Sequence, residues 1–87
     1  MKIEHVYVDY LPQELKSNTL YISEYFQIAL HLCFCGCGYE IATPLTKGMW
    51  ELEKLDNKNV SLRPSIGNYN IPCKSHYFIT DNQVVFV

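Results

Sequence analysis

The chain has 87 residues, a formal net charge of −2 at pH 7 and a hydrophobic fraction of 48%. This length predicts one domain, residues 1–87, whose small core would benefit from a staple such as a metal ion. The acidic balance and the scattered lysines argue against a nucleic-acid surface. The charged N-terminal segment is unlike a signal peptide, and no apolar run is long enough to cross a membrane. We therefore expect a cytoplasmic protein.

Strand signals dominate the first half of the chain. Polar and apolar side chains alternate over residues 3–10 and 19–23, and a period of two predicts strands. Between them, Pro12 in residues 11–15 could begin one helical turn. Residues 25–35 also alternate, and here a short helix that begins after Ser23 and runs into a strand is the competing interpretation.

The second half continues in the same way. A short strand that contains Val60 and Leu62 is expected to stop at Arg63-Pro64, before a loop over residues 65–72. Asp81-Asn82 is a two-residue hairpin signal between two apolar runs. The remaining predicted strands are residues 39–45, 50–55, 76–80 and 83–87. Six to eight short strands with little helix predict a mainly β, antiparallel fold.

Potential metal ligands cluster in residues 31–38, which read HLCFCGCG. Gly36 and Gly38 allow the backbone to curl, so the last cysteine can turn back toward the others. The ligand candidates in this segment occupy alternate positions: His31, Cys33, Cys35 and Cys37.

A second pair of candidate ligands, Cys73 and His76, lies near the end of the chain. Zinc takes four ligands, usually thiolate and imidazole in a reducing compartment. We expect two or three of the earlier cysteines to join this pair around one zinc ion that stabilises the fold, with His31 left over. The alternative is that the cysteines are small buried apolar side chains. The candidate metal ligands are therefore Cys33, Cys35, Cys37, Cys73 and His76.

Ser65 and His31 are the candidate catalytic residues. Ser65 lies in the predicted loop, where the backbone N–H groups of Ile66 and Gly67 could stabilise an oxyanion. The alternative is a turn serine that only caps local N–H groups. His31 could be a metal ligand, a general base or a buried structural residue. Glu40 could act as a base beside a zinc-bound water.

The combined motifs resemble a small bacterial family, over about residues 11–87, that is catalogued as a domain of unknown function. Genes of that family often lie beside those for a ubiquitin-like protein and its E1- and E2-like enzymes. The segments that carry the resemblance are LYIS (20–23), HLCFCGCG (31–38), PL (44–45), Trp50, VSLRPSIGN (60–68) and PCKSHYFI (72–79). The resemblance implies a zinc-binding β domain and a peptidase that processes or removes the modifier. It also implies that Ser65 and His31 are the catalytic residues.

Two functions follow from these observations. In the first, the protein is a hydrolase that acts on the modifier, through Ser65 and His31 or through a zinc-bound water. In the second, it is a non-catalytic zinc module that binds the ubiquitin-like protein or its E1/E2 partners through an exposed surface.

Overall fold

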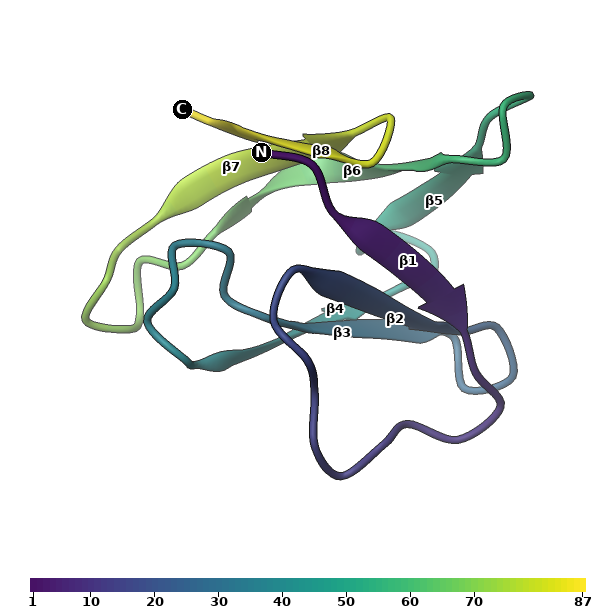
Figure 1. Ribbon diagram of the computed structural model, residues 1–87, viewed down its shortest axis with the longest axis horizontal. Helices are drawn as coiled ribbons and strands as arrows, with labels where there is room; N and C mark the ends of the chain where they lie inside the picture. The colour runs from purple at the N-terminus through teal and green to yellow at the C-terminus, as the bar shows by residue number, and fades with distance from the viewer.

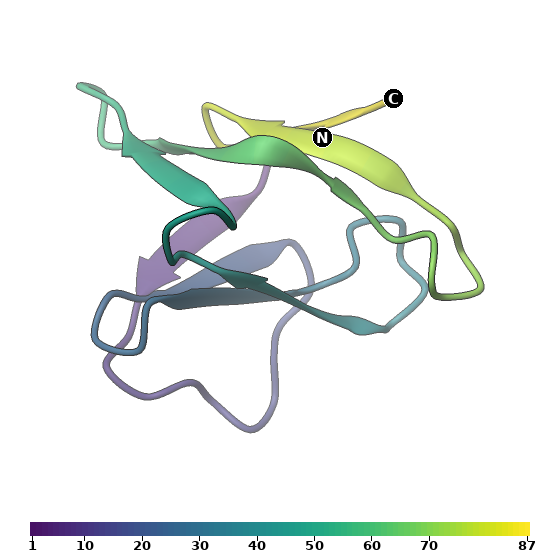
Figure 2. The ribbon, with the colours of Figure 1, turned by 180° about the vertical axis from the view of Figure 1, so that it is seen from behind.

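Eight β-strands and no helix make up the structure, a computed structural model that describes residues 1–87 (Figure 1). The strands form two four-stranded sheets, ordered β1-β2-β3-β4 and β5-β6-β7-β8. Figures 1 and 2 show the sheets as two layers that face each other. The predicted mainly β fold is confirmed, and there is no helix long and apolar enough to cross a membrane. The strand bounds are β1 (Glu4–Tyr7), β2 (Thr19–Ser23), β3 (Ile28–Leu32), β4 (Glu40–Pro44), β5 (Glu51–Lys54), β6 (Val60–Gly67), β7 (His76–Thr80) and β8 (Gln83–Phe86).

The first sheet departs from the predictions in two places. Strand β1 pairs with β2 in parallel, whereas all other neighbours are antiparallel. The connection over residues 8–18 is long enough to return the chain to the other end of the sheet, and it contains no helical turn. The helix considered after Ser23 is also absent, because a turn leads directly into β3.

The hairpin predicted at Asp81-Asn82 is confirmed between β7 and β8. Both residues have positive φ, 51° and 57°, which a two-residue type I′ turn requires. The Asn82 side chain also accepts a hydrogen bond from the Val60 N–H (2.8 Å). The turn is thereby fixed to the start of β6.

The core lies between the two sheets. Its fully buried members come from the inner faces of β2, β3, β6 and β7: Leu20, Ile22, Ala29, Val60, Leu62, Ile79 and Tyr77, with Ile66 almost as buried. Because side chains alternate along a strand, the residues next to Ile66 on β6 and to Tyr77 on β7 face outward. Ser65, Gly67 and His76 belong to this outward set.

Strand β6 is longer than predicted. It was expected to stop at Arg63-Pro64, but it continues through Ser65 to Gly67. Proline lacks an N–H, so it is tolerated in a strand only at edges and irregular positions. Pro64 lies in such a position, between Leu62 and Ile66, where the register with β7 shifts. Ser65 therefore lies on a strand and not in a loop.

Candidate functional site

Four thiols gather where the loop after β3 meets the loop before β7, two segments that lie side by side in Figures 1 and 2. Their Sγ atoms all lie within 4.8 Å of one another, and none forms a disulfide. The Cys33 Sγ lies 3.4 Å from Cys35 Sγ and 3.8 Å from Cys73 Sγ. Cys37 completes the group, because Gly36 and Gly38, at φ of 92° and 87°, curl the backbone as expected.

This thiol group fits a tetrahedral metal site. Zinc–sulfur bonds of about 2.3 Å place the four sulfurs of such a site about 3.8 Å apart, close to the separations observed. Hydrogen bonds from the side chain and backbone of Ser75 lower the pKa of Cys73 to about 6, which favours the thiolate that a metal requires. Four protein ligands would fill the coordination sphere, an arrangement typical of structural sites.

His76, predicted as a metal ligand, lies outside the thiol group. Its Nε2 is 2.7 Å from Ser65 Oγ, and its Nδ1 is 2.8 Å from the hydroxyl of Tyr69. The neighbouring Tyr77 is fully buried, so alternation along β7 turns His76 to the outer face of the sheet. Cys73 precedes the strand and turns the other way, toward the cysteines. The structure thus brings together all four predicted cysteines but pairs His76 with Ser65.

The Ser65–His76–Tyr69 group forms a hydrogen-bonded series on the outer face of β6 and β7. In the tautomer protonated on Nδ1, the Ser65 hydroxyl donates to Nε2, and the Nδ1–H donates to the Tyr69 oxygen. Gly67 makes room for the tyrosine, because a Cβ at this position would lie 2.8 Å from the Tyr69 ring. The serine hydroxyl therefore has an adjacent base, and the base has a partner that orients it.

His31 lies on the inner side of the β6–β7 ladder, opposite this arrangement. It is fully buried between the sheets, its Nε2 lies 2.7 Å from the Tyr77 hydroxyl, and its ring stacks on Phe34 at 4.4 Å. Burial lowers the pKa of His31 to about 4, so the ring is neutral at pH 7. The expected pairing of Ser65 with His31 is not present, because His31 belongs to the inner layer and Ser65 to the outer face.

Glu40, the other candidate base, is exposed at the start of β4 and is not a member of the thiol group. A metal held by four thiols leaves no position for a water that Glu40 could activate. A metal ion at the thiol group would therefore have no open coordination position for the zinc-bound water route.

The chain matches a known protein family. Residues 7–87, nearly the whole chain, match the family described as "Bacterial ubiquitination-like system serine protease (BubE)". Neither the curated proteins nor the solved structures give a match. The resemblance to a peptidase family of a bacterial ubiquitin-like system is confirmed.

We predict that the thiol group, without His76, binds a metal ion. Chelation or Cys73→Ser should unfold the protein, because structural zinc contributes about 10–16 kcal/mol of apparent binding free energy, as much as a small domain's whole stability. His76→Ala should retain about one metal ion per chain. Metal content by mass spectrometry and thermal melting by circular dichroism measure both effects. Metal loss in His76→Ala, or an unchanged melting temperature after complete metal removal, would contradict this assignment.

Proposed function

The chain belongs to the BubE family of bacterial ubiquitination-like system serine proteases, and we propose that it cleaves the bond after the C-terminal residue of a ubiquitin-like modifier. Cleavage there would either process a precursor of the modifier or release the modifier from a conjugate. The observation that carries the proposal is the 2.7 Å contact between Ser65 Oγ and His76 Nε2. Ser65 is the nucleophile, and His76 takes the role that the sequence suggested for His31.

In the first step, Ser65 Oγ attacks the carbonyl carbon of the modifier's last residue while His76 Nε2 accepts the hydroxyl proton. A C–O bond forms, and the carbonyl oxygen becomes an oxyanion. When the intermediate collapses, the C–N bond breaks, and the leaving amine takes the proton from His76. The products of this step are the free amine and an ester between the modifier and Ser65.

In the second step, water hydrolyses that ester. His76 Nε2, neutral again, accepts a proton from the water as its oxygen attacks the ester carbonyl. The bond to Ser65 Oγ breaks, and His76 returns the proton to the serine. The modifier leaves with a free C-terminal carboxylate, and both side chains return to their starting state.

Tyr69 takes the place that a carboxylate occupies in many serine hydrolases. Its hydroxyl oxygen accepts the hydrogen bond from His76 Nδ1–H and so selects the tautomer in which Nε2 is a free acceptor. A neutral phenol orients the ring, but it stabilises the imidazolium less than an aspartate would. We infer an orienting role for Tyr69 and not a role in proton transfer.

We propose that the thiol group binds zinc and has a structural role. When bound, the ion would cross-link the loop after β3 to the loop before β7 through the four thiolates. Ser75 lies beside this group, with its Oγ 3.2 Å from Cys33 Sγ, and directly precedes His76. Free thiols of this kind are typical of a reducing cytoplasm, where we place the protein.

A second candidate function is that of a non-catalytic module that binds the ubiquitin-like protein or its E1/E2 partners. The observation that favours it is an exposed aromatic cluster of Tyr10, Tyr25 and Phe26, with ring centroids 4.8–6.5 Å apart. Aromatic side chains of this kind are enriched at protein interfaces. The serine–histidine contact would have no role in such a module.

Kinetics of the two catalytic candidates separate these functions. The substrate is the ubiquitin-like protein of the same bacterial system, fused at its C-terminus to a fluorescent reporter. Ser65→Ala and His76→Ala should each lower kcat by at least about 10³-fold, and the double variant should lose little more, because the two residues act as a unit.

The matched control is His31→Phe, which keeps an aromatic ring against Phe34 and leaves the Ser65–His76 contact intact. It should retain kcat within about tenfold when circular dichroism shows that it is folded. A folded His31→Phe variant as inactive as His76→Ala would refute this choice of base. Binding of the modifier by the wild type without cleavage would favour the non-catalytic module.

The orienting role of Tyr69 has its own test. Tyr69→Phe removes the hydroxyl that holds His76, so kcat should fall about tenfold with little change in KM. Gly67→Ala should lower kcat similarly, because its Cβ would displace the Tyr69 ring. The double variant should lose no more than one of the single variants, since both changes remove the same contact. Additive losses, or a change confined to KM, would show that Tyr69 does not orient the base.

A further inference from the structure

The part of β6 that carries Ser65 has a neighbouring strand on only one side. Strand β5 pairs with β6 from Val60 to Arg63. The last pair joins Arg63 of β6 to Glu51, the first residue of β5. The chain that precedes β5 then turns away from β6, because the Trp50 N–H donates to the carbonyl of Pro44 (3.0 Å). Residues 64–67 of β6 therefore have β7 on one side and no strand on the other.

Backbone groups on this stretch point to the open side. The Asn68 N–H donates to the Ser75 carbonyl (2.8 Å), which makes these two residues a hydrogen-bonded pair. Hydrogen-bonded and non-bonded pairs alternate in an antiparallel ladder, so the N–H and C=O of Gly67 point away from β7. No hydrogen bond outside the strand ladders uses the backbone of Gly67 or Ser65. The N–H and C=O of Gly67 are therefore available to pair with an extended chain.

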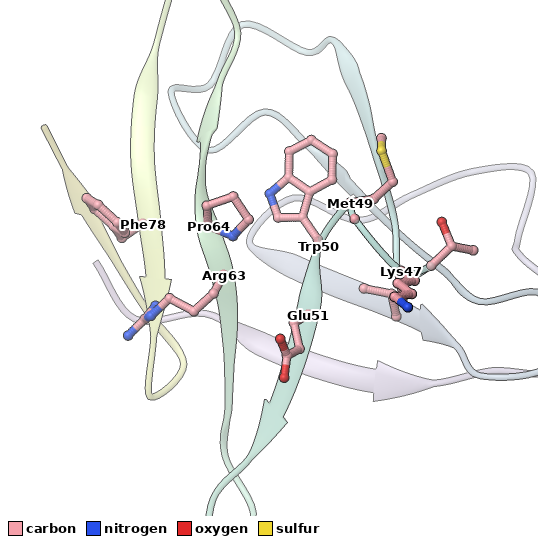
Figure 3. Close-up of a pocket in the computed structure, with 10 residues that line it drawn as sticks. Lys47, Met49, Trp50, Glu51, Arg63, Pro64 and Phe78 are labelled. Carbon is pink, nitrogen blue, oxygen red and sulfur yellow. The ribbon is translucent and has the colours of Figure 1, made fainter.

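Two neighbouring cavities lie along the same edge, and we refer to the pair as the trough. The cavities share Trp50, and one of about 710 Å³ lies beside Pro64 while one of about 270 Å³ lies beside Ile66 and Gly67. Figure 3 shows Trp50 next to Pro64, with Met49 on one side and Phe78 on the other. Ser65 itself lines neither cavity, but in β6 it lies between the residues that line the first (Arg63, Pro64) and those that line the second (Ile66, Gly67). A peptide in this trough would pass the nucleophile along its length.

We propose that the C-terminal tail of the ubiquitin-like modifier binds here as an added β-strand, along residues 64–67 of β6. The proposal rests on the function proposed above, because the occupant is the chain that Ser65 cleaves. Main-chain hydrogen bonds to Gly67 would hold the tail, and its alternate side chains would enter the trough beside Trp50 and Met49. The substrate class is thus an extended peptide tail, recognised mainly through its backbone.

Other strand edges fit this role less well. The edge of β8 is already covered by the N-terminal residues, because the Val84 N–H donates to Met1 O (2.7 Å) and the Ile3 N–H donates to Asn82 O (2.9 Å). The edges of β1 and β4 belong to the other sheet. The open stretch of β6 is the edge that includes Ser65 itself.

Backbone methylation of the substrate tests strand addition. The probe is a ten-residue peptide with the C-terminal sequence of the modifier, linked to a fluorogenic amine, with one backbone amide N-methylated at a time. Methylation at alternate positions should lower kcat/KM about fivefold to tenfold, because those amides pair with β6. Methylation at the positions between should change it less than twofold.

Two further measurements complete the experiment. Met49→Ala should raise KM, because the half-exposed Met49 side chain lines the trough, whereas the control Val6→Ala, on the exposed surface of β1 in the other sheet, should leave KM unchanged. In the Ser65→Ala protein, the unlabelled peptide should shift the amide NMR signal of Gly67.

The outcomes distinguish the two proposals. A methylation profile without alternation, or NMR shifts at the aromatic cluster and none at Gly67, overturns strand addition, while Ser65-dependent cleavage would still support the proposed function. Absence of cleavage by the wild type overturns the proposed function. In that case a peptide-induced shift at Gly67 would still support binding at this edge.

Discussion

The pairing of Ile66 with Tyr77 in the buried part of the β6–β7 ladder is the constraint on which the site depends. Both side chains belong to the core, so the residues beside them, Ser65 and His76, must lie on the outer face. A register slip of one residue would move the histidine into the core and the tyrosine into solvent. The energy of core packing thus fixes the position of two outward side chains, and their 2.7 Å contact follows from it.

The start of β7 separates the thiol group from the Ser65–His76 contact. Cys73 and His76 are three residues apart, and one turns to the thiol group while the other turns to Ser65. A polar network borders the thiol group, in which Asn68 Nδ2 donates to Ser75 Oγ (3.1 Å) and to the Tyr77 hydroxyl (3.4 Å), and Ser75 and Tyr77 flank His76 in the chain. A metal ion bound by the thiols would therefore stiffen the end of the ladder at which His76 lies.

Local pattern was enough to predict the mainly β fold, the Asp81-Asn82 turn and the gathering of the four cysteines, because each depends on alternation, turn chemistry or ligand spacing. The extension of β6 through Pro64 was not predicted, since it depends on where β5 ends and on an irregular register that only the folded sheet reveals. The partner of Ser65 was missed for a related reason. His76 was assigned to the metal by its spacing from Cys73, but Cys73 lies in a turn and His76 begins β7, so this spacing does not fix which way the two side chains point. The contact of His76 with Tyr69 likewise depends on the turn after Gly67 and has no sequence signature.

Covalent labelling tests most directly the claim that Ser65 is a nucleophile activated by His76. The protein would be treated with a fluorophosphonate, a reagent that phosphonylates activated serine hydroxyls, and the modified residue would be located by peptide mass spectrometry. The account predicts one adduct, on Ser65, in the wild type and in a folded His31→Phe variant, and a strongly reduced labelling rate in His76→Ala. Labelling of a different residue, or a His76→Ala protein that is labelled as fast as the wild type, would contradict it.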